Sequence, residues 1–165
     1  MDIKLITTKT EEQIHKLARL AYEIWNEYYI RLLSQQQIDY MLDRFQSVQA
    51  ITEQLKQGYH YFFIQQERNI VGYAAVKQEG ESLFLSKLYI KKEARGQGFG
   101  KAALQLITKM AAERQLCKIW LTVNRHNASS IAMYERIGFD IVNEQVADIG
   151  NGYVMDDYIM ELTIS

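Results

Sequence analysis

The glycines at positions 96, 98 and 100 are the part of this sequence whose spacing most directly suggests chemistry. They stand in residues 95–101, Arg-Gly-Gln-Gly-Phe-Gly-Lys, between a predicted strand over Leu83–Ile90 and a predicted helix over Gly98–Arg114. Alternate glycines allow a tight turn and leave backbone N–H groups uncovered at the start of a helix, where the helix dipole also attracts anions. The spacing therefore predicts a phosphate-binding loop.

Two well-known phosphate loops do not match these residues. The dinucleotide fingerprint requires a third glycine where Lys101 stands. The Walker loop requires Ser or Thr after its lysine and a glycine at its first position, whereas this chain has Ala102 and Arg95 there. What remains is the pattern Arg-x-x-Gly-x-Gly. By itself, this pattern is as compatible with a tight strand-to-helix turn that carries solvated basic residues as it is with a phosphate-binding loop.

The same pattern resembles the acyl-CoA pyrophosphate loop of the GCN5-related N-acetyltransferase (GNAT) family. Downstream, the chain has a predicted strand over Ile119–Val123, an Asn-containing turn over residues 124–127 and a predicted helix over Ala128–Arg136, which is followed by Gly138-Phe139. This order is similar to the second half of the family's acetyl-CoA site. The resemblance extends over essentially the whole chain and implies that acetyl-CoA is the co-substrate.

The resemblance assigns the cofactor contacts to three segments of the chain. The pyrophosphate would accept hydrogen bonds from backbone N–H groups, with added charge from the side chains of Arg95 and Lys101. The backbone at the end of the first strand would pair with the pantetheine arm as another strand would. The N–H donors expected are those of Gly96, Gln97, Gly98, Phe99, Gly100 and Lys101, and the strand residues are Leu88, Tyr89 and Ile90.

Two side chains near the second predicted strand also have roles in the family. Tyr134 occupies the position of the general acid, and an un-ionised phenol with a pKa of about 10 can protonate a departing thiolate. A tyrosine on an amphipathic helix is otherwise a half-buried packing residue. Asn127 stands where the family contacts the cofactor, and it is equally well placed to cap the helix that begins at Ala128.

The sequence does not provide an obvious general base. The strand positions where several family members carry a glutamate are Ser86 and Thr122 in this chain, and neither side chain accepts a proton at neutral pH. Water, backbone carbonyls or Glu23 remain as proton acceptors.

Substrate contacts are expected from the less family-like parts of the chain. Tyr22, Trp25 and Tyr29 fall on one predicted helical face, with Tyr28 beside them, and such a face indicates core packing more often than a binding wall. A group of acidic residues near the last predicted hairpin could attract a polycationic amine or could be solvated surface charge. Its members are Asp148, Asp156 and Asp157.

The elements that must position these residues alternate between strand and helix periodicity. A strand meander followed by a crossover helix predicts a mixed sheet with helices on both faces. The family resemblance implies the α/β (α+β) fold of the acyl-CoA N-acyltransferase type, with a mostly antiparallel central sheet of about seven strands. Besides the elements already given, the expected strands are Ile3–Ile6, Tyr59–Gln66, Asn69–Lys77, Asp140–Val146 and Tyr153–Leu162. The remaining helices are one from a capping box at Thr10 to about Tyr28, then Gln35–Phe45 and Val48–Gln57.

Composition limits the class of protein. With 165 residues, the chain is expected to form a single domain over residues 1–165. No apolar run approaches the roughly 20 residues of a membrane span, and the N-terminus lacks the layout of a signal peptide, so we expect a cytoplasmic protein without membrane contact. The one cysteine, Cys117, precedes an apolar strand and is expected to be a small core residue. His15, His60 and His126 lack metal-ligand spacing, so no metal is predicted.

Together these features predict an N-acetyltransferase that moves the acetyl group of acetyl-CoA directly to a primary amine, either a small amine such as a polyamine or a peptide amine. Residues 53–56 and 152–160 look distantly like bacterial polyamine acetyltransferases. The alternative is a module that binds acetyl-CoA as a sensor without turnover. A net charge of −1 does not favour nucleic-acid binding. The only feature that supports such binding is the group of basic residues around Lys91 and Lys92. A homodimer is compatible with the sequence.

Overall fold

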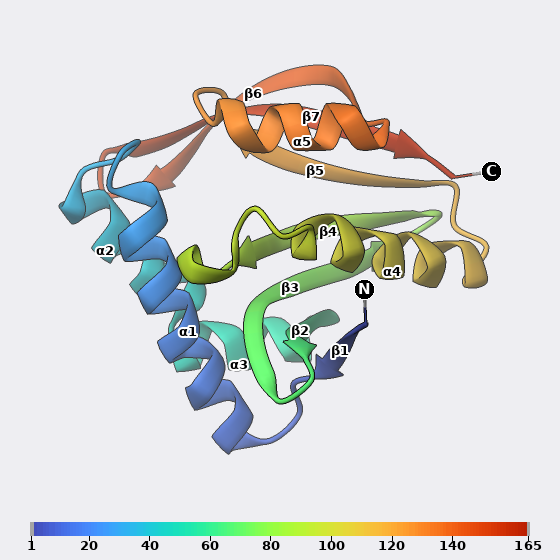
Figure 1. The fold of residues 1–165 in the computed structure, drawn as a ribbon. Coiled ribbons are helices and arrows are strands. Elements are labelled where there is room, and N and C mark those ends of the chain that lie inside the picture. Colours follow the sequence, from blue (N-terminus) through green and yellow to red (C-terminus); the bar gives the residue numbers. More distant parts are fainter. Residues whose placement is uncertain (1, 165) are drawn as a thin grey trace.

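One continuous sheet of seven strands runs through the protein in the order β1-β2-β3-β4-β5-β7-β6. The computed structural model describes residues 2–164, and Figure 1 shows their arrangement. The strands are β1 (Ile3–Thr7), β2 (Tyr59–Gln66), β3 (Asn69–Glu79), β4 (Ser82–Ile90), β5 (Lys118–Asn124), β6 (Asp140–Gly150) and β7 (Tyr153–Thr163). The helices are α1 (Glu11–Tyr29), α2 (Gln35–Gln46), α3 (Val48–Lys56), α4 (Phe99–Glu113) and α5 (Ala128–Ile137), with a 3₁₀ turn η1 (Lys92–Ala94).

The sheet is mixed because one pair of neighbouring strands is parallel. β4 and β5 are joined by the crossover helix α4 and run in the same direction, whereas the other neighbouring strands are antiparallel. The parallel pairing extends only from Ser82 opposite Lys118 to Phe84 opposite Trp120. Beyond these residues the two strands diverge, as Figure 1 shows toward the side of α1 and α2. The expected fold, a mostly antiparallel mixed sheet of seven strands with helices on both faces, is confirmed.

The two faces of the sheet bury separate apolar cores. Helices α4 and α5 cover one face, where Leu104 and Ile107 of α4 pack against side chains such as Val76 of β3. Helices α1, α2 and α3 cover the other face, where Tyr73 of β3 packs among residues such as Ile24. Because successive side chains of a strand point to opposite faces, the central strand β3 contributes to both cores. β3, which pairs with β4, is therefore packed on both of its faces.

Polar side chains define where the helices begin. Thr10 forms a capping box, since its hydroxyl accepts from the Gln13 N–H while the Gln13 side chain accepts from the Thr10 N–H. Ser34 and Ser47 cap α2 and α3 in the same way with one side-chain bond each. The expected helices and strands agree with the structure to within a few residues at their ends, and the η1 turn before the glycine loop was not anticipated.

Two expectations about burial are wrong. Cys117 is exposed, because Leu116 and Ile119 take the buried positions on either side while the Cys117 N–H donates to the Glu81 carbonyl at the edge of the turn. Tyr22 is 62% exposed and points away from the core that Trp25 and Tyr29 fill. Among residues 2–164, no helix is long and apolar enough to cross a membrane.

Candidate active site

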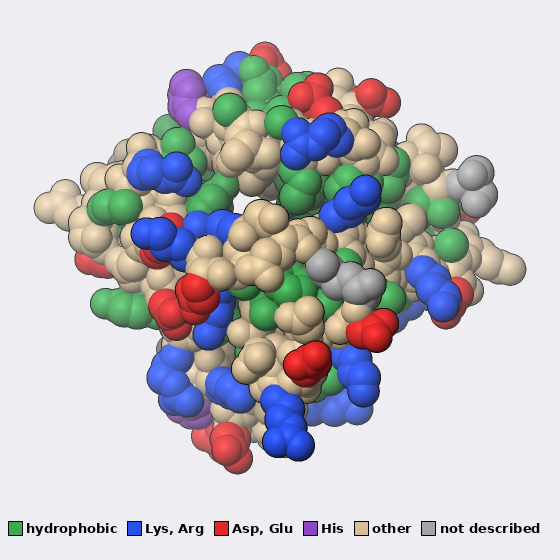
Figure 2. All heavy atoms as spheres, viewed as in Figure 1, with side chains coloured by type: hydrophobic (Ala, Val, Ile, Leu, Met, Phe, Trp, Pro, Cys, Tyr) green, Lys and Arg blue, Asp and Glu red, His purple; other side chains and the backbone are tan. Residues whose placement is uncertain are grey.

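A cavity of about 1070 Å³ opens where β4 and β5 stop pairing. Its walls come from the separated ends of these two strands, the loop before α4, and the helices α1 and α5, with β6 and β7 closing one side. Figure 2 shows a hollow at this level between the upper and lower parts of the molecule. Because the edges of β4 and β5 are unpaired there, their backbone groups are free to bind a ligand that lies between them.

The glycine loop forms one end of this cavity. Gly96 and Gly98 have φ values of +76° and +85°, which other residues adopt only with strain, and Gly98 is the N-cap of α4. The first bond of the helix joins the Ala102 N–H to the Gly98 carbonyl. Within residues 2–164, the N–H groups from Gly96 to Lys101 find no acceptor. A row of free N–H groups at a helix start is a site for an anion, so the loop fits a pyrophosphate.

The structure gathers nearly all of the predicted cofactor-binding residues around the cavity. Those that line it are Leu88, Tyr89, Ile90, Arg95, Gly96, Gly98, Phe99, Gly100, Lys101 and Asn127. Gln97 is the member of the predicted set that does not line it, and its side chain instead donates to the Glu93 carbonyl. Phe99 is also part of the core beneath the loop. The predicted segments, distant in the sequence, thus meet at one place.

Arg95 has a partner that the sequence did not reveal. Its guanidinium forms a two-pronged ion pair with Glu27 of α1, with N–O distances of 2.6 and 2.9 Å. Its Nε donates to the Ile90 carbonyl at 3.0 Å, and its guanidinium lies 4.9 Å from the centre of the Tyr28 ring. Such a planar, bidentate contact fixes both partners. Arg95 therefore ties the glycine loop to α1 and β4, whereas Lys101 forms no ion pair with any of residues 2–164.

Tyr134 lies on α5 at the opposite side of the cavity. Its side chain is 7% exposed and packs edge-on against Phe139, with ring centres 5.4 Å apart. Burial raises the pKa of the Tyr134 phenol above its ordinary value near 10, and the neighbouring Tyr29 and Tyr28 raise it further. The hydroxyl makes no hydrogen bond within residues 2–164. The phenol is therefore held protonated on the cavity wall with its proton free to be donated.

Asn127 begins the helix that carries Tyr134. Its Oδ1 accepts from the Ser130 N–H at 3.4 Å, which confirms the predicted capping role. The same oxygen accepts a 2.6 Å hydrogen bond from the Tyr28 hydroxyl, which also lies 3.0 Å from the Ser130 hydroxyl. The start of α5 is thus fastened to α1.

Aromatic side chains from α1 and the sheet line the cavity between these groups. The Tyr29 and Tyr89 hydroxyl oxygens are 2.6 Å apart, and Trp25 and Tyr28 also line the cavity, with their rings within 5.2–6.4 Å of those of Tyr29 and Tyr89. Beneath them, the Trp25 Nε1 donates to the Tyr73 hydroxyl at 2.8 Å. Burial raises the pKa of Tyr29, Tyr73 and Tyr89, so these phenols stay neutral. The wall is therefore apolar and rich in π-electron faces.

The residues considered as proton acceptors are placed very differently. Ser86 and Thr122 both line the cavity, as expected from their strand positions. Glu23 is exposed and does not line it. Asp157 of β7, which the sequence grouped with surface acids, lines the cavity and is 4% exposed. Burial, with a smaller contribution from Asp156, raises the pKa of the Asp157 carboxyl to about 6.

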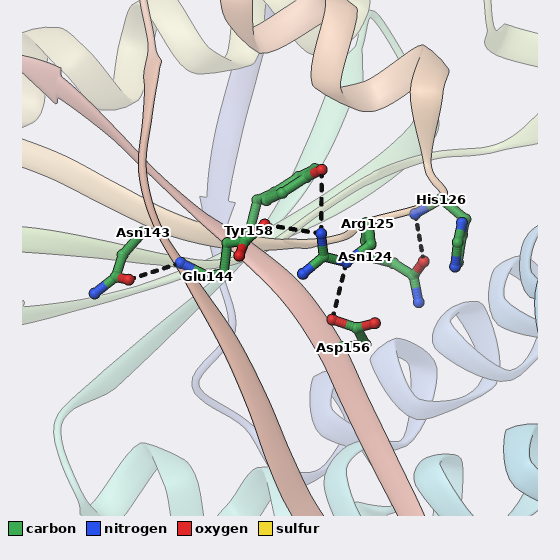
Figure 3. A network of polar contacts seen from close by, with 7 residues as sticks. All are labelled: Asn124, Arg125, His126, Asn143, Glu144, Asp156 and Tyr158. Atoms are coloured by element: carbon green, nitrogen blue, oxygen red, sulfur yellow. Dashed lines mark hydrogen bonds and ion pairs between the residues drawn. The ribbon is translucent and has the colours of Figure 1, made fainter.

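The neighbouring acids have other partners. Asp156 accepts a 3.1 Å hydrogen bond from Nε of Arg125, whose guanidinium also contacts Glu144 at 2.8 Å and the Tyr158 hydroxyl at 3.3 Å (Figure 3). Asp148 is exposed and accepts from the Gly150 N–H. A signal for Asp157 was present, since it shares strand parity with Tyr153 and Met155, but a carboxylate at such a position is ordinarily assigned to the surface.

No group of three or more His, Cys, Asp or Glu side chains in the described part of the chain is arranged to hold a metal ion.

Known proteins share both the sequence pattern and the fold. The sequence profile of the Acetyltransferase (GNAT) family matches residues 14–139. A probable spermine N(1)-acetyltransferase of Bacillus subtilis subsp. natto is 27% identical over 68% of this chain and 78% of its own length. The [ribosomal protein bS18]-alanine N-acetyltransferase of Escherichia coli is 28% identical over 51% of this chain and 58% of its own length.

A solved structure gives the corresponding view of the fold. The PaiA N-acetyltransferase of Thermoplasma acidophilum, in complex with coenzyme A, superposes with a TM-score of 0.79 and 21% identity over 99% of both chains.

Proposed function

Because the chain belongs to the Acetyltransferase (GNAT) family, we propose that it transfers the acetyl group of acetyl-CoA directly to a primary amine, with Tyr134 protonating the departing thiolate. The protein is an acetyl-CoA-dependent N-acetyltransferase, as its family and its relatives establish. The proposal adds the role of Tyr134, the residues that hold the cofactor and the chemical class of the acceptor.

The observation that carries the proposal is the convergence of three features on one cavity. The free N–H groups of the loop before α4, the unpaired edges of β4 and β5, and the phenol of Tyr134 all line it. The loop would hold the pyrophosphate of acetyl-CoA, and the backbone of Leu88, Tyr89 and Ile90 would hold the pantetheine arm. This arrangement leads the thioester along β4 toward α5.

Tyr134 has the properties that an acid for this reaction needs. When the amine nitrogen attacks the thioester carbon, a C–N bond forms and the C–S bond breaks, so negative charge develops on sulfur. A phenol, whose ordinary pKa is about 10, is protonated at neutral pH and can give its proton to that sulfur. Its hydroxyl has no hydrogen-bond partner among residues 2–164 that would compete for this proton.

The acceptor class follows from the walls of the remaining space. Aromatic faces from Trp25, Tyr28 and Tyr29 attract a cation, and this part of the cavity also holds the Asp157 carboxyl. The relatives are named for spermine and for the alanine of a ribosomal protein, and both acceptors present a primary amine. We therefore place polyamines and peptide N-termini first among the acceptors of this chain.

The test is thiol release from acetyl-CoA in the presence of spermine, spermidine and a peptide with an N-terminal alanine, using wild type, Tyr134→Phe and Tyr22→Phe. Tyr134→Phe should reduce acceptor-dependent turnover at least tenfold, since a general acid contributes about 10²–10⁴, while acetyl-CoA affinity stays the same. Tyr22→Phe is the matched control because Tyr22 is exposed. Equal turnover in wild type and Tyr134→Phe would remove Tyr134 from the mechanism.

A further inference from the structure

Asp157 is a buried carboxylate on the wall of the cavity. It stands opposite Asn124 in the pairing of β5 and β7, beside the part of β5 that has lost its β4 partner. On β7 it shares parity with Tyr153 and Met155, which pack on the face covered by α1, α2 and α3. The glycine loop leads into α4 on the other face. A carboxylate and an anion-binding loop therefore serve the same cavity from opposite faces of the sheet.

The Asp157 carboxyl is buried without a positive partner. Its Oδ1 has no hydrogen-bond partner in the part of the chain that the structure describes, and no Lys, Arg or His of that part lies within ion-pair distance. Its neighbour Asp156, by contrast, is bonded to Arg125. Burying a carboxylate without a partner is costly, so such groups persist where a ligand supplies the opposite charge.

Neutral side chains from three elements are neighbours of Asp157. From α1, Tyr29 lies close enough for the Asp157 charge to raise its pKa. From β5 and β6, the paired residues Asn124 and Gln145 are uncharged. Asp156 is the charged neighbour on the same strand, and the cations that line the cavity are Lys87, Arg95, Lys101 and Arg136. Aromatic faces next to one carboxylate form a typical enclosure for an ammonium group.

We infer that Asp157 receives the protonated acceptor amine and removes its proton, with Trp25, Tyr28 and Tyr29 as the aromatic wall that encloses the ammonium group. This inference rests on the proposed amine acetylation. It fills the role of proton acceptor that Ser86, Thr122 and Glu23 do not fill, and it makes Asp157 a residue that contacts the substrate.

The proton balance is complete. The ammonium group carries three protons, of which one passes to Asp157 and one stays on the amide nitrogen. The third leaves the nitrogen as the C–N bond forms and the C–S bond breaks, and it replaces the proton that Tyr134 gives to the thiolate. Asp157 then releases its proton to water. The pKa of Asp157, about 6 before the amine binds, leaves the carboxyl mostly ionised at pH 7 and so able to receive the ammonium group.

The first experiment compares wild type, Asp157→Asn and Asp148→Asn in the acetylation of spermidine and of a peptide with an N-terminal alanine from pH 5 to 9. Asp157→Asn should lower kcat/KM for the amine about 100-fold and leave acetyl-CoA affinity unchanged. It should also abolish the fall in kcat/KM below about pH 6 that we expect for the wild type. Asp148→Asn is the control, since Asp148 is exposed and asparagine can still accept from the Gly150 N–H. An Asp157→Asn enzyme that keeps its rate and its acid limb overturns the inference.

A second measurement separates this inference from the proposed function. Carbon-13 NMR follows the Asp157 carboxyl of the wild-type protein with coenzyme A bound, alone and with either spermidine or the alanine peptide. A bound ammonium should lower the carboxyl pKa from about 6 toward the ordinary value of an aspartate. If the wild type acetylates no amine but this shift occurs, the proposed reaction fails while amine binding at Asp157 stands. If neither spermidine nor the alanine peptide shifts the pKa, the inference is wrong.

Discussion

The hydroxyl of Tyr28 donates a 2.6 Å hydrogen bond to Oδ1 of Asn127 and so joins α1 to the first turn of α5. The same oxygen caps the Ser130 N–H. Since α5 carries Tyr134, the bond from α1 fixes the helix on which the proposed acid stands.

Replacing Tyr28 with phenylalanine should loosen α5 without emptying the aromatic wall. We expect a loss of about 1 kcal/mol in the free energy of unfolding and a severalfold fall in kcat, because Tyr134 is less firmly positioned. Urea unfolding and steady-state kinetics measure the two effects, with Tyr22→Phe as the exposed control. An unchanged kcat would show that α5 holds its place without this bond.

The ion pair between Glu27 and Arg95 leads to a second prediction. Glu27→Gln leaves a half-buried guanidinium without its anionic partner, so the glycine loop should lose its attachment to α1. We expect roughly tenfold weaker binding of coenzyme A by calorimetry and a loss of about 1–2 kcal/mol in stability. Glu27→Asp keeps the charge on a shorter side chain, so its coenzyme A affinity and its stability should lie between those of the wild type and those of Glu27→Gln. Unchanged affinity in Glu27→Gln would mean that the loop is held by its glycine turns alone.

The loop glycines allow backbone strain to be distinguished from contact with the ligand. A Cβ on Gly100 would lie 3.5 Å from Sδ of Met133, an ordinary contact, and Gly100 has no positive φ. Gly100→Ala should therefore leave the unfolding temperature unchanged but weaken coenzyme A binding, if phosphate oxygens approach this backbone closely. Gly98→Ala should also lower stability by about 1 kcal/mol because of its φ of +85°. Full affinity in Gly100→Ala would exclude a close phosphate contact at that residue.

Lys87 provides a test of the electrostatics of the cavity. Burial lowers the pKa of its ammonium group to about 8. Between about pH 8 and the ordinary lysine value near 10.4, the unfolded chain therefore binds more protons than the folded one, so this group adds stability as the pH rises through that window. In the wild type, the free energy of unfolding should therefore increase by on the order of 1–2 kcal/mol between pH 7.5 and pH 9.5. We expect Lys87→Met to lack this increase, and urea unfolding at the two pH values measures it. Parallel stability curves for the two proteins would contradict the lowered pKa.

Much of the fold could be predicted from the sequence because its signals are local. The alternation of apolar residues, the capping box at Thr10 and the turn glycines each act within a few residues, and they predicted the strands and helices closely. The loop over residues 95–101 and the Tyr134 helix were found in the same way, because their motifs are short and contiguous. The prediction failed where burial depends on register, as with Cys117 and Tyr22.

Tertiary structure alone decided which side chains share the cavity and which charged side chains have a partner of opposite charge. Glu27 and Arg95 are 68 residues apart, and Tyr28 and Asn127 are 99 apart, so no local pattern could pair them. The two adjacent aspartates at 156 and 157 look alike in the sequence, yet one meets Arg125 at 3.1 Å and the other is buried without a cation. The sequence determined the glycine loop and the helix of Tyr134, because backbone conformation follows from neighbouring residues. Packing of distant strands and helices determined the charge and solvation of the cavity around Asp157, because those depend on every group within a few ångströms in space.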